Sequence, residues 1–427
     1  MYISKKPPRI FYGWWVVGAS FLINLYTAGA IYYGFTAIIE PIANDLGWSY
    51  SQISLGFSLR GLEIGLLAPF TGMLADRWGP RRLVVGGAVV TALGLTLLSR
   101  ASSLAMFYGA FLTIALGISA LSTTVLMTAL GNWFDRKIGL VSGIAASGFG
   151  FGGLLIPVVV KLVDSWGWQT ATAALGLGLL VVAAPLGSLF RHKPEHYGYL
   201  PDGEVKSPAA TGANPDVPRI SFKDVGIRRV LRSSAFWYMT IAFGCQLLVA
   251  QAVFTHVMPY LSSVEVSRSI SSSVATFVPV VSVVGRLGIG WLGDKLDSRL
   301  VTVATFVMVC SGLIIFEYVT SAGMWLLVPF VILFGIGHGG IVSLRPSLVR
   351  EFFGRDNFGT IFGSVIGLMV LLSMAGPPLA GWVFDHWGSY QNTWLAFVGL
   401  VGVAGLSITA VPRVGVNRGR AEDADSA

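Results

Sequence analysis

The residues most able to do chemistry in this chain are ionisable side chains that stand inside long apolar segments. Arg286 lies halfway along one such segment, among apolar residues and glycines, and His256 and His338 stand in two others. A guanidinium group is tolerated there when it faces a wet cavity or an anion, and its planar fork suits a carboxylate. Histidine exchanges a proton near neutral pH. The sequence therefore predicts a site that binds a carboxylate and handles protons.

Two further charges, Arg60 and Glu63, stand three residues apart and therefore on one face of a helix. They form either a mutually neutralising pair, or a site in which Arg60 is a second cation and Glu63 is its counter-ion or a proton carrier. Two available arginines would suit a dianion or a bulky anion, whereas a compensated Arg60 leaves Arg286 to bind a single carboxylate. The other candidates are open in the same way. Arg286 could instead form a structural ion pair, and His256 or His338 could be hydrogen-bonded packing residues.

The segments that carry these side chains have the composition of membrane helices. The chain is 54% hydrophobic and 12% charged, against about 25% charged residues in an ordinary soluble domain. We predict an all-α membrane protein with twelve spans, each near or above the ~20 residues that cross ~30 Å of hydrocarbon. The predicted spans are 11–39, 55–76, 83–99, 105–130, 138–163, 168–190, 235–261, 272–293, 300–320, 323–346, 358–384 and 391–411.

The positive charges predict how these spans are oriented. With both termini placed inside the cell, 24 of the 29 Lys and Arg residues fall on the cytoplasmic side, Arg345 and Arg350 among them. Only Arg100, Lys161 and Arg268 fall outside. Because Lys and Arg concentrate in cytoplasmic loops, both termini are predicted to be cytoplasmic. The net charge of +8 is thus a signal of membrane orientation and does not indicate a nucleic-acid partner.

The spans divide into two halves of six. Residues 1–190 form the predicted N-terminal bundle, and residues 233–412 form the C-terminal bundle. Between them, residues 191–232 are rich in Pro, Ser, Ala and Gly and then basic, which predicts a flexible cytosolic linker followed by an amphipathic helix on the membrane surface. Residues 413–427 are predicted to be a disordered tail.

The two halves share sequence patterns. GMLADRWGPRR (72–82) recurs in shortened form as GWLGDKLDSR (290–299), each time at the end of an apolar helix. Small residues spaced by four also recur, in the fifth span (Gly139, Gly143, Ser147) and in the eleventh (Gly359, Gly363, Gly367). Such spacing lets helix backbones approach closely. Internal repeats of membrane helices are typical of secondary transporters, with the substrate site between the repeats.

The sequence lacks the parts of an enzyme. It contains no phosphate-binding loop that ends in Lys-Ser/Thr, no Cys/His metal spacing and no soluble catalytic domain. The glycine-rich GFGFGG (148–153) lies in an apolar helix with no strand before it, so we interpret it as a packing motif. No cofactor or metal is expected. Without an ATPase motif, transport must be driven by a gradient of an ion or a substrate.

With these motifs identified, the chain resembles a known family. GMLADRWGPRR resembles the loop motif between the second and third helices of the major facilitator superfamily. WFDRKIGLVSGIAASGFGFGG (133–153) and FYGWWVV (11–17) resemble signatures of its monocarboxylate transporter family. HVMPYL and VSVVGRLGIGWLGDKLDSR are similar to the bacterial branch of that family and its oxalate:formate exchanger relatives. The resemblance covers all twelve spans.

The resemblance implies alternating access, in which two pseudo-symmetric six-helix bundles rock about a central site. Asp76, at the end of its helix, would meet the positive N-terminus of the span that begins near Phe358 and would hold the cytoplasmic side shut. A network of charges around Asp76 would help to keep the cytoplasmic side closed. An equivalent contact, between the repeated motif of the second half and the fifth span, would do the same. The remaining gating candidates are Arg77, Arg81, Arg136, Asp294 and Arg299; the arginines could instead serve only to set topology.

The resemblance also assigns substrate contacts. The family's eighth-span arginine binds the substrate carboxylate, and Arg286 occupies that position. Animal relatives carry an aspartate one turn earlier, where this chain has Ser282, so proton coupling must use another group. His256, in an HxxP motif, is the first candidate and Glu63 the second. The first-span lysine of animal relatives is absent, and Tyr33 could line the site instead.

Together these residues predict a proton-coupled symporter of a small monocarboxylate such as lactate or pyruvate, in the inner (plasma) membrane. Three alternatives remain: an organic-anion exchanger, either for dicarboxylates or of the oxalate/formate type, an efflux carrier for an aromatic acid, and a carboxylate sensor that no longer transports. The expected partners are a small organic anion, protons and the lipid bilayer, with no nucleic acid. The sequence leaves the oligomeric state undecided.

Overall fold

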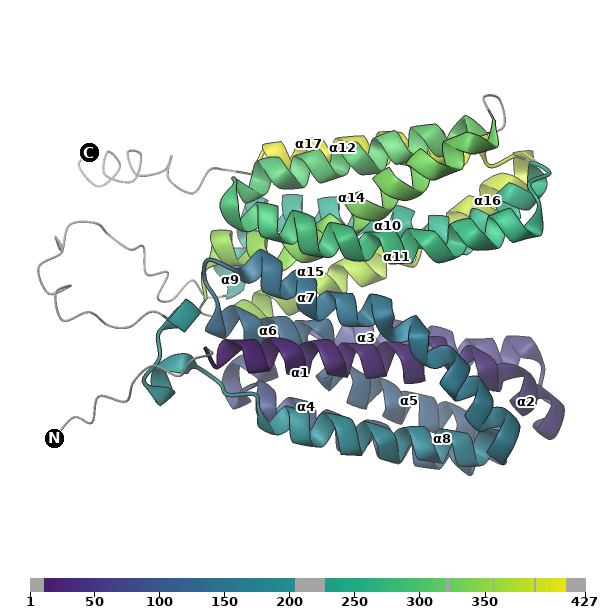
Figure 1. Cartoon of the computed structure of the whole chain (residues 1–427), viewed down its shortest axis with the longest axis horizontal. Helices are drawn as coiled ribbons and strands as arrows, with labels where there is room; N and C mark the ends of the chain where they lie inside the picture. The colour runs from purple at the N-terminus through teal and green to yellow at the C-terminus, as the bar shows by residue number, and fades with distance from the viewer. Residues whose placement is uncertain (1–10, 204–226, 320–322, 356, 388, 412–427) are drawn as a thin grey trace, which may run out of the picture. The chain divides into compact units, whose positions relative to one another are not determined.

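The computed structural model describes residues 11–203, 227–319, 323–355, 357–387 and 389–411 (Figure 1). Within these ranges every regular element is a helix, which confirms the predicted all-α fold class. A few side chains inside helices, those of residues 57–64 among them, lie outside the description.

The helices form two compact units. Unit 1 comprises residues 1–220 together with 357–367, and unit 2 comprises 221–356 together with 368–427. The sequence predicts a division between residues 190 and 233. The structure adds one feature to that division, because the first part of helix α15 (Phe358–Ser373) packs within unit 1.

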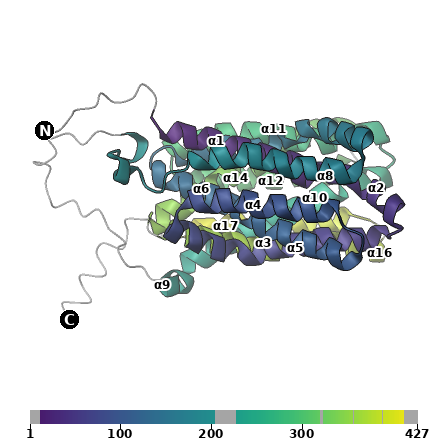
Figure 2. The same cartoon turned by 90° about the horizontal axis from the view of Figure 1, so that it is seen from below.

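Unit 1 is built from helices that run along one another, as α4 and α8 do in Figure 2. Gly176 and Gly187 of α8 let its backbone approach α4. The helices are α1 (Gly13–Tyr26), the π-helix η1 (Thr27–Tyr33), α2 (Thr36–Leu46), α3 (Tyr50–Trp78), α4 (Pro80–Ser99), α5 (Leu104–Ala120), α6 (Thr123–Trp133), α7 (Ile138–Phe151), η2 (Gly152–Leu155) and α8 (Ile156–Ser188).

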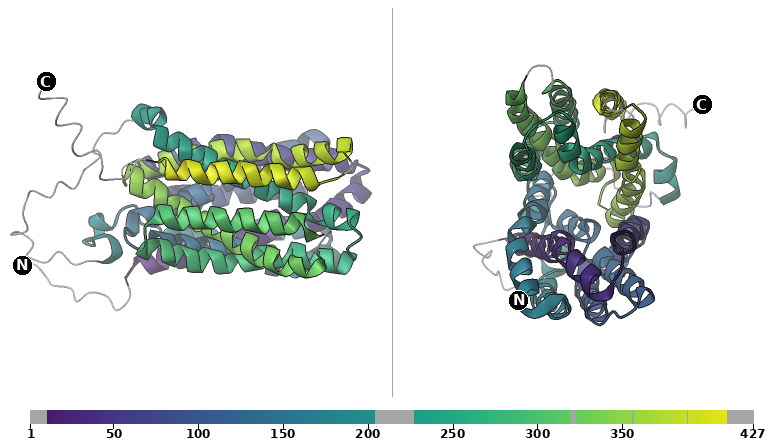
Figure 3. Two further views of the ribbon diagram at one scale, coloured as in Figure 1. Left: turned by 90° about the horizontal axis from the view of Figure 1, so that it is seen from above. Right: turned by 90° about the vertical axis from the view of Figure 1, so that its right-hand side faces the viewer.

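Unit 2 repeats this arrangement, with α12 and α17 side by side in Figure 3. The tightest pair is α11 and α14, where Gly285 meets the backbone of Ile336 and Gly339 meets that of Ser282. The helices are α9 (Ile227–Arg232), α10 (Ser234–Ser263), α11 (Arg268–Lys295), α12 (Ser298–Glu317), η6 (Met324–Leu326), α14 (Leu327–Phe353), the second part of α15, α16 (Gly376–Trp387) and α17 (Gln391–Thr409).

Ten helical stretches in the described part of the chain are long and apolar enough to cross a membrane. One of them, Ile138–Ser188, contains 51 residues and leaves helical geometry inside α8, at Gly167, whose φ is 76°. Figure 1 shows the chain turning back between the helix labelled α7 and the run labelled α8. Helix α3, which carries Arg60, Glu63 and Asp76, is not among the ten. The number of twelve spans and the cytoplasmic termini therefore stay predictions.

Residues 191–203, which we call the clasp, are folded against unit 1. The clasp contains two short 3-10 helices, Pro194–Tyr197 and Pro201–Gly203. The carboxylate of Asp202 accepts hydrogen bonds from the backbone N–H groups of Asp135 (2.9 Å) and Arg136 (2.8 Å), in the turn between α6 and α7. The flexible linker predicted from residue 191 is thus anchored in this first part. Of the predicted amphipathic helix the structure describes α9, and residues 204–226 lie outside the description, as does the tail.

Helices α3 and α15 touch backbone to backbone within unit 1. A Cβ atom on Gly72 would overlap the carbonyl oxygen of Gly359, and a Cβ atom on Gly363 would overlap that of Ala68. Small residues at these positions remove the side chains that would otherwise separate the helix axes. The eleventh-span ladder of small residues found in the sequence is therefore the surface that meets α3.

Replacing Gly72 with valine is expected to destabilise the protein, because the new side chain must force α15 away from α3. Overpacking of this kind costs about 1–3 kcal/mol. The measurement is the thermal unfolding of purified protein in detergent. The matched control is Gly86→Val, since a Cβ atom at Gly86 meets nothing within 4 Å. Equal melting temperatures for the two variants would contradict the contact.

Candidate functional site

Three helices of unit 2 bring four buried polar side chains together. They are Arg286 on α11, Gln246 on α10, and His338 and Arg345 on α14. Their exposed fractions are 8% for Arg286, 7% for His338, 7% for Arg345 and 0% for Gln246. His338 and Arg345 stand two turns apart and therefore on one face of α14. We call these four residues the polar cluster.

Glycines hold the helices of the polar cluster at close range. Gly339, next to His338, has no side chain, and the backbone of Ser282 on α11 fills that place. One turn later the Ser343 hydroxyl donates a 2.8 Å hydrogen bond to the backbone carbonyl of Arg286. The position of Arg286 relative to α14 is therefore fixed by the backbone and by a buried side chain.

A chain of hydrogen bonds runs through the polar cluster. Arg345 donates from Nη2 to Oε1 of Gln246 at 2.7 Å, and Nε2 of Gln246 lies 2.9 Å from Nδ1 of His338. A guanidinium group can only donate, so the amide oxygen of Gln246 must face Arg345 and its NH₂ group must face His338. Nδ1 of His338 then accepts, which means that it carries no proton. The geometry assigns His338 as a neutral imidazole protonated on Nε2.

The electrostatics of the polar cluster suit an anion. Arg286 and Arg345 lie close enough to interact with each other and with His338. No carboxylate among the described residues hydrogen-bonds to Arg345, whose other contact is the ring of Phe243 at 5.8 Å. A buried cation without an anion is costly by several kcal/mol. Nε2 of His338 makes no hydrogen bond to a described residue, so its N–H is also available to an acceptor.

Two members of the polar cluster were not predicted from the sequence. Gln246 is not among the candidates, and Arg345 is counted with the charges on the cytoplasmic side. The predicted tenth span ends at residue 346, whereas α14 continues to Phe353 and buries Arg345 and Arg350 (6% exposed). The available signal was the spacing of His338 and Arg345, which places both on one face of a helix and already lies within the predicted span 323–346.

His256 lies elsewhere in unit 2, ten residues along α10 from Gln246, or about 15 Å of helix. Its Nε2 lies 3.0 Å from the carbonyl oxygen of Pro377, and its Nδ1 lies 3.0 Å from the hydroxyl of Tyr390. The carbonyl only accepts, so Nε2 carries the proton and Nδ1 accepts from Tyr390. Both ring nitrogens are engaged in joining α10 to α16 and to the start of α17, which favours the packing alternative; the coupling role stays a prediction.

The remaining predicted substrate residues belong to unit 1. Tyr33, at the end of η1, is half-buried, and its ring meets Phe149 edge to face at 5.6 Å. Arg60 and Glu63 lie in α3, but their side chains are outside the described part of the structure. Both interpretations of that pair therefore stay open.

Asp76 binds the beginning of α15 within unit 1. Its Oδ1 accepts from the N–H of Gly359 at 2.9 Å, and its Oδ2 accepts from the N–H and the hydroxyl of Thr360, both at 2.7 Å. A carboxylate at the N-terminus of a helix satisfies N–H groups that have no partner inside the helix and meets the positive end of the helix dipole. This is the contact expected from the sequence. Its role in gating stays a prediction.

The arginines expected around Asp76 lie at exposed positions of unit 1. Arg77, Arg81 and Arg136 are exposed, and the hydrogen bonds of Asp76 that the structure describes all go to α15. The charge network predicted around Asp76 therefore stays a prediction, as does the alternative that these arginines only set topology.

The equivalent residues of the second half have contacts of their own within unit 2. Arg299 donates from Nε to the carbonyl oxygen of Ile408 at 3.0 Å, in the last turn of α17. A cation is favourable at a helix C-terminus, where carbonyl groups lack partners. Asp294 is half-buried near the end of α11. The mirrored gating role of this pair stays a prediction.

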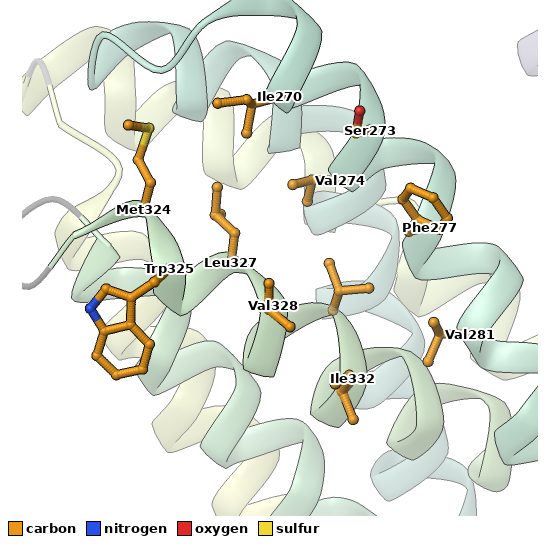
Figure 4. A pocket seen from close by; sticks show the side chains of 11 residues that line it. Ile270, Ser273, Val274, Phe277, Val281, Met324, Trp325, Leu327, Val328 and Ile332 are labelled. Carbon is orange, nitrogen blue, oxygen red and sulfur yellow. The ribbon is translucent and has the colours of Figure 1, made fainter.

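An apolar pocket of about 490 Å³ lies elsewhere on unit 2, between α11, η6 and the start of α14 (Figure 4). Its lining includes Phe277, Trp325 and Ile332, and Ser273 is the one lining residue with a hydroxyl group. None of the residues that line it is ionisable. An anion would lose its hydration there without compensation, so the pocket does not suit a carboxylate.

Replacing Asp76 with asparagine is expected to weaken the contact with α15, because an amide group cannot accept at both of its ends. The loss of charge-assisted hydrogen bonds to backbone N–H groups costs about 1.5–3 kcal/mol each. Thermal unfolding in detergent is the measurement, and Asp164→Asn, at an exposed position of α8, is the control. Identical unfolding of the two variants would show that the Asp76 contact contributes nothing to stability.

Comparison with known proteins agrees with this architecture. The family model described as Major Facilitator Superfamily matches residues 19–363 and 257–426. Monocarboxylate transporter 12-B of Danio rerio is 28% identical over 91% of this chain and 84% of its own length. Monocarboxylate transporter 12 of Rattus norvegicus is 27% identical over 92% of this chain and 84% of its own.

Among solved structures, the fold is similar to that of the transporter FucP in its outward conformation. The TM-score is 0.68 at 13% identity, with 94% of this chain and 100% of that chain covered. These relatives are membrane transporters and not enzymes. The extent of the family match, together with the repeated helical architecture, shows that this multi-pass protein of the plasma membrane belongs to the Major Facilitator Superfamily.

Proposed function

We propose that this protein is a secondary active transporter that moves a small monocarboxylate of the lactate or pyruvate type together with a proton. The observation that carries the proposal is the polar cluster, in which two buried guanidinium groups lie near a neutral histidine. Arg345 is buried, and no carboxylate among the described residues hydrogen-bonds to it. Such a cation favours an anion as ligand, and the planar guanidinium group binds a carboxylate through two hydrogen bonds. The similarity to monocarboxylate transporter 12-B supports the same class of substrate.

Arg286 is the proposed primary ligand of the carboxylate. Its backbone is held by Ser343, so its side chain starts from a fixed point on α11. The N–H on Nε2 of His338 is a further donor that the described residues leave for a substrate. A small monocarboxylate would compensate one positive charge of the polar cluster and would leave room for a proton to be bound with it.

Anion exchange is the second candidate function. It is favoured by Arg345, because two guanidinium groups in one unit can each bind a carboxylate of a dianion. An exchanger for dicarboxylates would use both charges and would not need a proton.

Gating is proposed at the contact between α3 and α15. Asp76 ties the end of α3 to the first N–H groups of α15, and Gly72 lets the two backbones touch. In an alternating-access cycle, this contact would form in one state and open in the other.

Reconstituted protein is expected to accumulate labelled lactate or pyruvate in empty proteoliposomes when an inward proton gradient is imposed. Oxalate and benzoate are tested alongside to cover the dianion and aromatic alternatives. Uptake of an anion only into vesicles preloaded with anion would establish exchange in place of symport. If none of the four anions is taken up under either condition, symport and exchange of these anions are both ruled out.

Replacing Arg286 with glutamine is expected to raise the dissociation constant of the transported anion by at least about 30-fold. Removing one partner of a buried charge pair costs 2–5 kcal/mol, and each 1.4 kcal/mol is tenfold in affinity. Arg286→Lys should recover part of the loss, since it retains charge without the bidentate fork. Arg100→Gln, at an exposed position, is the control. If a folded Arg286→Gln protein binds the anion with wild-type affinity, Arg286 is not a ligand of the anion.

A further inference from the structure

We infer that Gln246 links anion binding at Arg345 to proton binding at His338, by turning its side-chain amide over when the anion arrives. The inference rests on the proposed function and names the coupling group within the same site. Gln246 is fully buried and holds Arg345 with one end of its amide and His338 with the other. The orientation of one amide group therefore decides whether Nδ1 of His338 faces a donor or an acceptor.

Without substrate, the amide is fixed by Arg345. A guanidinium group can only donate hydrogen bonds, so Oε1 of Gln246 faces Arg345 and lies 2.7 Å from its Nη2. The NH₂ group is then directed at Nδ1 of His338 at 2.9 Å. A proton on Nδ1 would clash with this NH₂ group, and two nearby guanidinium charges oppose a third positive charge. The empty site therefore holds His338 neutral.

A carboxylate bound by Arg286 also reaches Arg345, which interacts with Arg286, and there it takes the place of Oε1 as the acceptor for Nη2. The amide of Gln246 is then released and can turn by about 180° about its terminal bond, a torsion that is broad and roughly two-fold. Oε1 now faces His338 and accepts a hydrogen bond from a proton on Nδ1. That proton comes from water, no covalent bond between heavy atoms changes, and one negative and one positive charge enter the site together.

The reverse sequence releases both. When the carboxylate leaves, Arg345 regains Oε1 of Gln246, the NH₂ group returns to Nδ1, and the proton must depart. Anion and proton thus increase each other's affinity by the same factor, which is the reciprocity that any symporter needs.

Few other ionisable groups face His338 from the helices packed around it. Arg286 on α11 and Arg345 on α14 are the cations near it. The rings of Phe254 and Phe334 flank its imidazole at 5.3 Å and 6.3 Å. Helix α10 contributes Gln246. The histidine of the same helix, His256, is hydrogen-bonded to Pro377 and Tyr390 instead.

Helix α12, which also packs against α14, has its charged residues, Arg299 and Glu317, at its two ends, and Cys310 faces α17. The short helix η6 contains no ionisable residue. His338 is therefore the group whose protonation the amide of Gln246 can control.

Replacing Gln246 with leucine keeps the approximate volume and removes both hydrogen bonds. Proton-driven accumulation of the transported anion, measured relative to anion counterflow by the same variant, is expected to fall about tenfold or more, because the link between the two ligands is lost. Gln251→Leu, at an exposed position of the same helix, is the control and should accumulate normally. His338→Gln should behave like Gln246→Leu and should also abolish the pH dependence of anion binding.

The outcomes separate this inference from the proposed function. Wild-type protein that shows counterflow but no proton-driven accumulation overturns the symport proposal itself. Wild-type protein that accumulates the anion, with Gln246→Leu accumulating equally well, overturns the role of Gln246 alone.

A second measurement does not depend on transport. The chain has five histidines, so ¹⁵N-labelled histidine gives a simple NMR spectrum in which His338→Gln identifies one signal set. Without substrate, His338 should show the neutral form protonated on Nε2, and saturating lactate, pyruvate, oxalate or benzoate should convert it to the doubly protonated form near neutral pH. A His338 that stays neutral with every anion that binds overturns the inference.

Discussion

The positive charge of Arg345, buried inside an apolar helical unit, is the constraint that the rest of the site depends on. A guanidinium group cannot be left without acceptors in such surroundings, and the described structure supplies one neutral acceptor, the amide of Gln246. The amide oxygen accepts a hydrogen bond from Arg345 but does not neutralise its positive charge. The amide in turn fixes the tautomer of His338. The arrangement of three side chains on two helices thus follows from one cation to which no carboxylate among the described residues hydrogen-bonds.

The helix packing makes this arrangement rigid enough to be specific. Gly285 and Gly339 bring α11 and α14 into backbone contact, and Ser343 adds a hydrogen bond across the same interface. Unit 1 uses the same device at Gly72 and Gly363, where α3 meets α15. In a membrane, where water does not drive helices together, close packing and polar contacts of this kind supply most of the association energy. Gly72, Gly285, Gly339 and Gly363 thus contribute through the helix contacts that they permit.

The sequence was sufficient for the features that depend on local pattern. The long apolar segments predict the helical fold, Arg286 stands out as a charge inside a span, and the loop motif leads to the contact of Asp76 with α15. Features that depend on what a side chain meets were not predictable. Arg345 resembles a flanking charge until α14 is seen to continue past it, and a neutral glutamine such as Gln246 carries no signal in the sequence. The clasp was missed because proline-rich segments usually indicate a linker.

The clasp has a consequence for how the protein is made. Its residues follow α8 directly in the chain, and Asp202 reaches back to the turn between α6 and α7. The contact can therefore close as soon as residue 203 has left the ribosome, before any helix of unit 2 has been synthesised. Because the contact joins the segment after α8 to the turn between α6 and α7, we expect it to form only once these three helices have packed together.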